Sequence, residues 1–124
     1  MQTIQQQRAK HALDGVRTFA NNPNISRTQR SEYKSYASAL PAMIHINGLG
    51  QAAAFYKSKG GTHKELYKLL SSWLTQENQP YAGKDELLAG IVECDMHRYR
   101  LAQAEAQALM DWVKKFAKAY LSED

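Results

Sequence analysis

The sequence has 124 residues, of which 44% are hydrophobic, with a net charge of +4 and one cysteine. This length predicts a single domain, residues 1–124, large enough to bury one core without disulfides. No apolar run reaches about 18 residues, which excludes a membrane-spanning helix, and residues 1–7 lack the basic-then-apolar pattern of a signal peptide. The lone Cys94 excludes an internal disulfide and fits a reducing compartment, so we expect a cytoplasmic protein without a membrane partner.

The charge is distributed unevenly along the chain. Residues 1–62 contain eight Lys/Arg and two acids, a net charge of +6. Residues 63–124 contain eight Lys/Arg and ten acids, a net charge of −2. A basic first half indicates a polyanion or an acidic protein as its partner.

The first predicted helix spans residues 2–20. Its apolar residues recur at spacings of three and four and form one stripe, made of Ala9, Ala12, Leu13, Val16, Phe19 and Ala20. Lys10, Asp14 and Arg17 fall on the opposite side, whereas Arg8 borders the apolar stripe. We expect Arg8 to lay its aliphatic stem over the core and to keep its charge in water.

A turn and a capping signal predict the second helix. Residues 21–24, Asn-Asn-Pro-Asn, favour non-helical backbone. Ser26 and Gln29 have the spacing of a capping box, so the helix should begin there and run to about Leu40. Pro41 restricts the residue before it, and we therefore place it in the first turn of a third helix.

A glycine-containing corner follows, at Asn47-Gly48-Leu49-Gly50. Asparagine and glycine tolerate the left-handed backbone that ends one helix and starts another. The small residues Ala52-Ala53-Ala54 then allow another helix to pack closely. A phosphate-cradling loop is the alternative, but no Lys-Ser/Thr follows the glycines and no strand precedes them. We predict a buried helix–turn–helix corner.

The helix after the corner should end in residues 56–61, where two lysines precede two glycines. Thr62 and Glu65 have capping-box spacing for the next helix. That helix carries the clearest amphipathic pattern of the chain: Leu66, Leu69, Leu70, Trp73 and Leu74. Residues 76–83 are polar and predict a surface loop.

Two further helices complete the predicted fold. Asp85 should open a short helix, and Asp95 should cap a last one from Met96 to about Leu121, roughly 39 Å long. The last helix has an apolar seam in steps of three and four: Tyr99, Ala102, Ala106, Leu109, Val113, Phe116 and Tyr120. No segment has the alternation of a strand. The predicted fold class is all-α, a single-domain helical bundle of about five or six helices with a long C-terminal helix. Both tryptophans, Trp73 and Trp112, are expected in its core.

The residue types of a catalytic site are scattered. The four histidines show no ligand spacing: His11, His45, His63 and His97. Cysteine is among the most buried residue types, so Cys94 is interpreted as a packed, inert thiol. The carboxylates at 85–86 and 93–95 suit helix starts and solvated faces better than a metal site. We expect no enzyme, no cofactor and no metal, although a small nuclease stays as an alternative.

Three blocks of residues become informative when they are taken together. The first is Gln7-Arg8-Ala9 with Ala12-Leu13 and Val16; the second is Tyr36-Ala37, Leu40-Pro41, Ile44, Asn47-Gly48-Leu49-Gly50-Gln51-Ala52 and Ala54-Phe55; the third is Tyr99-Arg100, Glu105-Ala106, Leu109 and Trp112-Val113-Lys114-Lys115-Phe116-Ala117. In this order and spacing, from about Gln2 to Leu121, the chain resembles the small α-helical subunit of the type III-B CRISPR effector, the Cmr module.

The resemblance implies a non-catalytic small subunit of an RNA-guided, RNA-targeting complex in antiviral defence. In that family, copies stack beside a filament of backbone subunits and line the channel for the two RNA strands. The implied partners are guide and target RNA, the backbone and other Cmr-module subunits, and further copies of this chain. Cleavage belongs to other subunits. A helical adaptor or regulator that binds an acidic protein is the alternative function.

The resemblance does not assign RNA contacts, so we select them by charge and expected exposure. The basic residues of the first half have few acids near them and are predicted to bind RNA: Lys10, Arg17, Arg27, Arg30, Lys34, Lys57 and Lys59. The last helix supplies a second group: Arg100, Lys114, Lys115 and Lys118.

Overall fold

The structure is a computed structural model that describes residues 1–121. It contains α1 (Ile4–Ala20), α2 (Arg27–Asn47), α3 (Leu49–Lys59), α4 (Gly61–Leu74), α5 (Leu87–Glu93) and α6 (Met96–Tyr120). Within this described part no strand is present, so the predicted all-α bundle with a long C-terminal helix is confirmed. The last three residues of the predicted domain, 122–124, lie outside the described residues.

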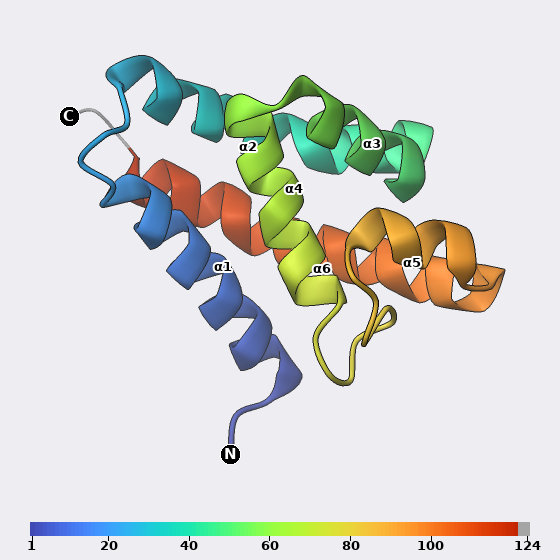
Figure 1. Cartoon of the computed structure of the whole chain (residues 1–124). Helices are drawn as coiled ribbons and strands as arrows, with labels where there is room; N and C mark the ends of the chain where they lie inside the picture. The colour runs from blue at the N-terminus through green and yellow to red at the C-terminus, as the bar shows by residue number, and fades with distance from the viewer. Residues whose placement is uncertain (122–124) are drawn as a thin grey trace.

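The longest helix, α6, is the element along which α1 and α2 both pack. In Figure 1 α4 crosses in front of α6, while α3 and α5 lie on the side away from α1. Helices α2 and α6 run antiparallel, because Arg30 contacts the carbonyl of Tyr120 whereas Pro41 contacts Gln107. The C-terminal ends of α1 and α6 therefore meet the start of α2, at the left of Figure 1.

Side-chain caps explain where three of the helices begin. Thr3 and Gln6 form a capping box that starts α1, and Ser26 and Gln29 form the predicted one that starts α2. The Asp95 carboxylate accepts the backbone N–H of Arg98 at 3.0 Å, as expected for the start of α6. In each case the side chain satisfies a first-turn N–H group that has no partner within its own helix.

The short helix α5 was predicted to open at Asp85, but it begins at Leu87, and the side chain of Glu86, which precedes it, makes no capping hydrogen bond.

Two further predicted helix boundaries are wrong. Helix α2 continues through Pro41 to Asn47, because Leu40 and Ile44 on either side of the proline are both fully buried in the core. The burial of both residues offsets the one intrahelical hydrogen bond that a proline removes. Thr62 is not a cap either, since Gly60 precedes α4 and the Thr62 hydroxyl donates to the Glu32 carboxylate at 3.0 Å.

The predicted corner between α2 and α3 is confirmed, and it depends on one glycine. Gly48 has φ +86° and ψ 157°, a conformation that residues with a Cβ avoid. Gly50 lies inside α3, where its N–H donates to the Tyr99 hydroxyl at 2.9 Å. The N–H of Leu49 donates to the side-chain oxygen of Gln103, also at 2.9 Å. Side chains of α6 thus cap α3 from about fifty residues away in the sequence.

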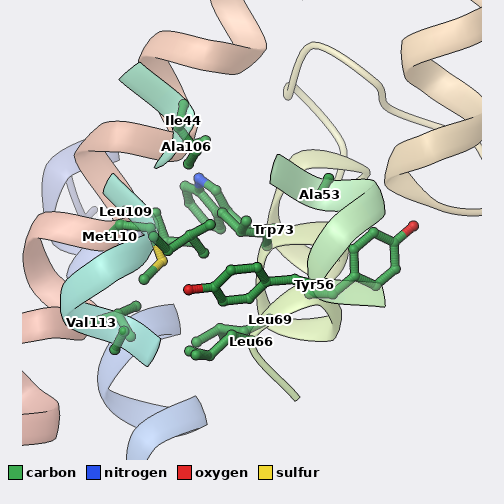
Figure 2. Close-up of a cluster of buried hydrophobic side chains, with 14 of the residues drawn as sticks. Ile44, Ala53, Tyr56, Leu66, Leu69, Trp73, Ala106, Leu109, Met110 and Val113 are labelled. Carbon is green, nitrogen blue, oxygen red and sulfur yellow. The ribbon is translucent and has the colours of Figure 1, made fainter. Parts of the chain in front are cut away.

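The core lies where α4 packs against α2, α3 and α6. Figure 2 shows Leu66, Leu69 and Trp73 of α4 directed toward the buried side chains of α6. Trp73 is buried as predicted, but Trp112 is only half-buried and stacks on Phe116 with ring centroids 5.5 Å apart. Tyr120, the last residue of the predicted seam, is exposed. Over the last turn of α6 the buried stripe lies one residue away from the predicted seam, at Ala117 and Leu121.

Candidate nucleic-acid interface

The seven predicted RNA-binding residues fall in three separate places. Lys10 lies on α1, Lys57 and Lys59 lie at the end of α3, and the other four lie near the junction of α1 and α2. The junction also receives the C-terminal end of α6, which carries further lysines. We name this region the basic end and define it by Arg17, Arg27, Arg30, Lys34, Lys114, Lys115 and Lys118.

Arg30 holds the basic end together. Its guanidinium donates to the carbonyl of Ala20 at 2.9 Å and to the carbonyl of Tyr120 at 3.2 Å. These carbonyls end α1 and α6, where the last C=O groups lack helical partners and carry partial negative charge. Arg30 therefore joins three helices, and its half-buried side chain is partly used for structure.

The antiparallel register places Lys34 among the lysines of α6. Arg30 lies opposite Tyr120, and Pro41 lies opposite Gln107, which donates to its carbonyl at 2.9 Å. Lys34, one turn after Arg30, consequently lies opposite the last turns of α6, which carry Lys114, Lys115 and Lys118. Like charges gathered in this way raise the local positive potential.

Most charges of the basic end have no acidic partner within residues 1–121. The ion pairs of this described part join Arg8 to Glu105, Lys10 to Asp14, Lys57 to Glu86, Lys68 to Glu65 and Lys84 to Glu93. None of them involves a residue of the basic end. Asp111 on α6 and Glu32 on α2 are the nearest acids along the two helices, and Glu32 is bonded to Thr62.

Lys10 and Lys57 are engaged with carboxylates of their own chain. Lys10 Nζ is 2.7 Å from an oxygen of Asp14, on the exposed side of α1. Lys57 Nζ is 2.6 Å from Glu86, which also accepts the Tyr67 hydroxyl. The hydrogen bond from Lys57, and then that from Tyr67, lowers the pKa of Glu86. Lys57 therefore connects α3 to the residue that precedes α5.

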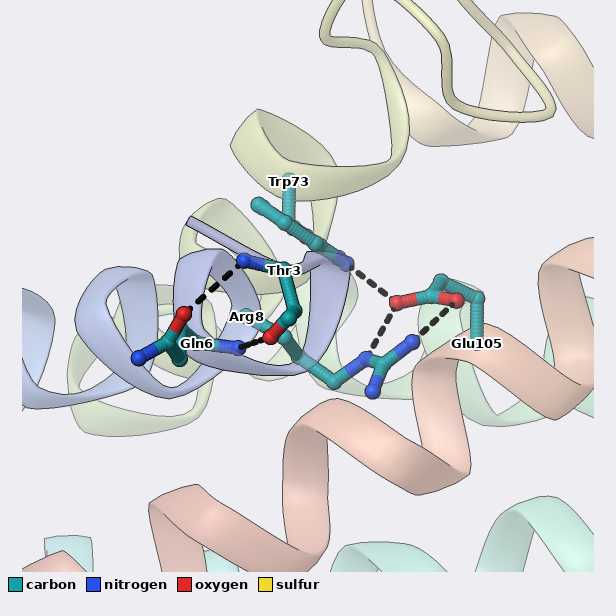
Figure 3. Close-up of polar contacts among 5 residues, drawn as sticks. All are labelled: Thr3, Gln6, Arg8, Trp73 and Glu105. Atoms are coloured by element: carbon teal, nitrogen blue, oxygen red, sulfur yellow. Dashed lines mark hydrogen bonds and ion pairs between the residues drawn. The ribbon is translucent and has the colours of Figure 1, made fainter. Parts of the chain in front are cut away.

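One mostly buried ion pair was missed by the sequence reasoning. The Arg8 guanidinium donates to both oxygens of Glu105, at 2.5 and 3.0 Å, and Trp73 Nε1 donates to the same carboxylate at 2.8 Å (Figure 3). Only 15% of the Arg8 side chain and 17% of that of Glu105 are exposed. Burial favours a raised pKa for Glu105, but the hydrogen bonds from Arg8 and Trp73 outweigh it, and the pKa is lowered. The carboxylate stays charged and joins α1, α4 and α6.

The described residues contain no cluster of three or more His, Cys, Asp or Glu side chains arranged to hold a metal ion. His11 is half-buried, with Nε2 at 2.9 Å from the Ser72 hydroxyl and 3.2 Å from the Leu69 carbonyl. Cys94 is half-buried too, next to the Arg98 guanidinium.

Between residues 1 and 121 we find no helix with the length and hydrophobicity that a bilayer crossing requires.

The fold and the basic end define a small all-α protein that displays cationic side chains, without acidic partners among residues 1–121, where three helices meet. The model of the family described as CRISPR-associated protein (Cas_Cmr5) matches residues 4–120. The CRISPR system Cmr subunit Cmr5 of Thermus thermophilus is 33% identical over 123 residues, which are 99% of this chain and 100% of that protein. The chain therefore belongs to the Cmr5 family, as its sequence blocks indicated.

A solved structure supports the same assignment. The X-ray crystal structure of a CRISPR-associated Cmr5 family protein from Thermus thermophilus superposes with a TM-score of 0.77 at 30% sequence identity. The match covers 98% of this chain and 100% of that one. The family's fold thus extends over nearly the whole chain.

Proposed function

We propose that the chain is the non-catalytic small subunit of a type III-B CRISPR effector complex in the cytoplasm. There it helps to form the filament that holds guide and target RNA in antiviral defence. The observation that carries the proposal is the full-length match to the Cmr5 subunit of a CRISPR Cmr system. Its partners are then the backbone and other Cmr-module subunits, further copies of itself, and the two RNA strands.

The basic end supports an RNA-binding role on physical grounds. Lysine and arginine side chains bind RNA by neutralising phosphates and releasing the counterions condensed there. Arg17 and Arg27 are exposed, Lys34 is half-exposed, and none of the three has an acidic partner within residues 1–121. We propose these three as the principal contacts.

The other predicted contacts take a smaller share in the proposal. Lys10 and Lys57 would have to leave Asp14 and Glu86 before they bind a phosphate. Arg30 donates to two backbone carbonyls, so only part of its guanidinium remains for RNA. Lys59 is exposed but lies far along the chain from the basic end, at the end of α3. With few principal contacts per copy, firm binding requires several copies on one strand.

Affinity capture tests the subunit role. A tagged chain recovered from its native cells should bring down other Cmr subunits together with RNA. Recovery of an acidic protein without RNA would instead support the adaptor function.

Salt titration of the isolated chain tests the RNA contacts. For single-stranded RNA the slope of log affinity against log salt is about −0.7 per phosphate, so three or four contacts give roughly −2 to −3. Binding that does not respond to salt would contradict the proposal. Metal-dependent cleavage of the RNA by the purified chain would contradict its non-catalytic part.

A further inference from the structure

A groove outside the basic end runs between the second half of α2 and α3. It has a volume of about 440 Å³ and is lined by Met43, Asn47, Gln51 and Phe55. Two of these side chains are amides, one is a thioether and one is an aromatic ring. Asn47, Gln51 and Phe55 are all exposed, and Phe55 as a whole residue is 43% accessible. The groove therefore offers a ring and hydrogen-bonding groups to an outside molecule.

Helical spacing adds a cation to the same surface. Gln51, Phe55 and Lys59 follow one another at intervals of four and so lie along one side of α3. Lys59 Nζ lies over the Phe55 ring, 5.7 Å from its centroid. Its charge is exposed and has no carboxylate partner among residues 1–121. A negatively charged group next to the ring would meet this ammonium first.

Other aromatic side chains hold the Phe55 ring in place. His63 meets Phe55 edge to face, with centroids 6.0 Å apart and planes at 87°. His63 in turn stacks on Tyr36, at 3.6 Å and 17°. Partial burial and the Lys59 charge lower the pKa of His63 more than Glu32 raises it, which favours the neutral imidazole. On one side, the Phe55 ring therefore packs against the His63 imidazole, which is itself stacked on Tyr36.

We propose that this groove binds an unpaired nucleobase of single-stranded RNA, with the base on Phe55 and the adjoining phosphate at Lys59. Every base has a π face, so an aromatic ring beside a cation suits single strands of any sequence. The amides of Asn47 and Gln51 carry both donors and acceptors, which match the edges of a base. The inference rests on the proposed RNA-binding function and adds a stacking site to its phosphate contacts.

The composition of the groove favours RNA over a protein segment as its occupant. The buried centre of a protein interface is depleted in charged residues, and lysine is among the residues that are under-represented there. Here a lysine lies directly over the aromatic ring, and amides make up half of the lining. A cation and polar edges next to an exposed ring fit a nucleotide, which has a flat apolar face and an anionic phosphate.

The test compares two probes with equal numbers of phosphates: a short single-stranded RNA and an abasic oligonucleotide of the same length. The isolated chain should bind the RNA more tightly than the abasic probe. Phe55→Ala should weaken RNA binding roughly 5- to 150-fold, the range for loss of one base–aromatic stack. The salt slope should not change, because no phosphate contact is removed. Phe55→Trp should keep the affinity.

The control is Ile46→Ala, which removes an exposed apolar side chain, 76% accessible, that does not line the groove. It should leave RNA binding unchanged, and circular dichroism should show that both alanine variants fold. If the wild-type chain binds the two probes equally, or Phe55→Ala binds RNA normally, this inference fails and the proposed function remains. If the wild-type chain binds neither probe even at low salt, the proposed RNA contacts fail together with this inference, whereas affinity capture still decides the subunit role. If Phe55→Ala keeps the preference for bases but no longer joins the other subunits, the groove is a protein interface instead.

Discussion

Two regions of the molecule use the same basic residue types in opposite ways. Arg8 lies nearly buried between α1, α4 and α6, with Nε and Nη2 of its guanidinium donating to the two carboxylate oxygens of Glu105. Arg17 and Arg27 lie in the basic end, exposed and without an acidic partner in the described part of the chain. Each region lies where three helices meet. The Arg8 region lies between the sides of α1, α4 and α6, and the basic end lies where α1 and α6 end and α2 begins.

The difference shows which charges serve the fold and which remain for a ligand. A charge removed from water must be paired, and removing its partner leaves an uncompensated buried ion. A solvated charge contributes little to stability, so its loss affects binding more than folding. Substitutions in the two regions should therefore separate stability from RNA association.

The largest loss of stability is expected from Glu105→Ala. It leaves the Arg8 guanidinium and Trp73 Nε1 without an acceptor in a region that is mostly closed to water. Breaking a buried pair in this way should lower the free energy of unfolding by roughly 3 kcal/mol. Chemical denaturation monitored by circular dichroism measures the change.

The matched control is Glu93→Ala, since Glu93 also pairs with a basic side chain, that of Lys84, but is about half exposed. An exposed pair contributes roughly 0–1 kcal/mol. Equal losses from the two variants would contradict the distinction between the paired interior and the solvated surface.

The next effect is expected at the corner between α2 and α3. Gly48→Val places a β-branched side chain at φ +86° with its Cβ about 3.0 Å from the Tyr99 hydroxyl. The backbone strain should cost about 2 kcal/mol. We expect no such loss from Gly50→Ala, because that Cβ meets Ile91 and Tyr99 at ordinary distances, 3.5 and 3.6 Å. Thermal unfolding of the two variants measures the two losses of stability. A larger loss from the alanine variant would overturn the assignment of the turn to Gly48.

The smallest effect is the pH dependence caused by His11. Burial lowers its pKa more than the Leu69 carbonyl and Asp14 raise it. The unfolded chain, with a histidine pKa of about 6.5, then binds more protons than the folded chain in mildly acidic solution. The contribution is fully present above about pH 7 and is lost as the pH falls toward the lowered folded-state pKa. His11→Gln should flatten this part of the stability curve, and an unchanged curve would contradict the assignment.

Local patterns in the sequence were enough to predict most of the helices. The capping boxes, the apolar periodicity and the glycine corner depend on residues a few positions apart, and the capping box at Ser26, the cap at Asp95 and the amphipathic pattern of α4 were confirmed. The helix boundaries predicted at Pro41 and Thr62 were wrong because they depend on contacts with residues far away in the sequence. Leu40 and Ile44 bury against other helices, and Thr62 binds Glu32, thirty residues earlier.

The candidate interface was less predictable for the same reason. Lys57 and Lys59 are near neighbours in the sequence, but one is bonded to Glu86 and the other lies over Phe55. Arg8 was expected to reach water, and its pairing with Glu105, 97 residues away, has no local signal. Glu105 belongs to the third block of residues that carries the family resemblance, and Arg8 belongs to the first. Their joint presence in these blocks could have suggested that the two side chains pair.

The most direct test of the central claim is RNA retention by the assembled complex after matched charge reversals. One variant changes Arg17, Arg27 and Lys34 to Glu, and the other changes Lys64, Lys68 and Lys84 to Glu, so both alter the net charge equally. The complexes should contain the same subunits, which gel analysis verifies. We expect the first variant to lose much more RNA and to show a shallower salt slope, because under the proposed function the side chains that it replaces contact phosphates. Equal losses, or a larger loss from the second variant, would show that RNA does not bind at the basic end.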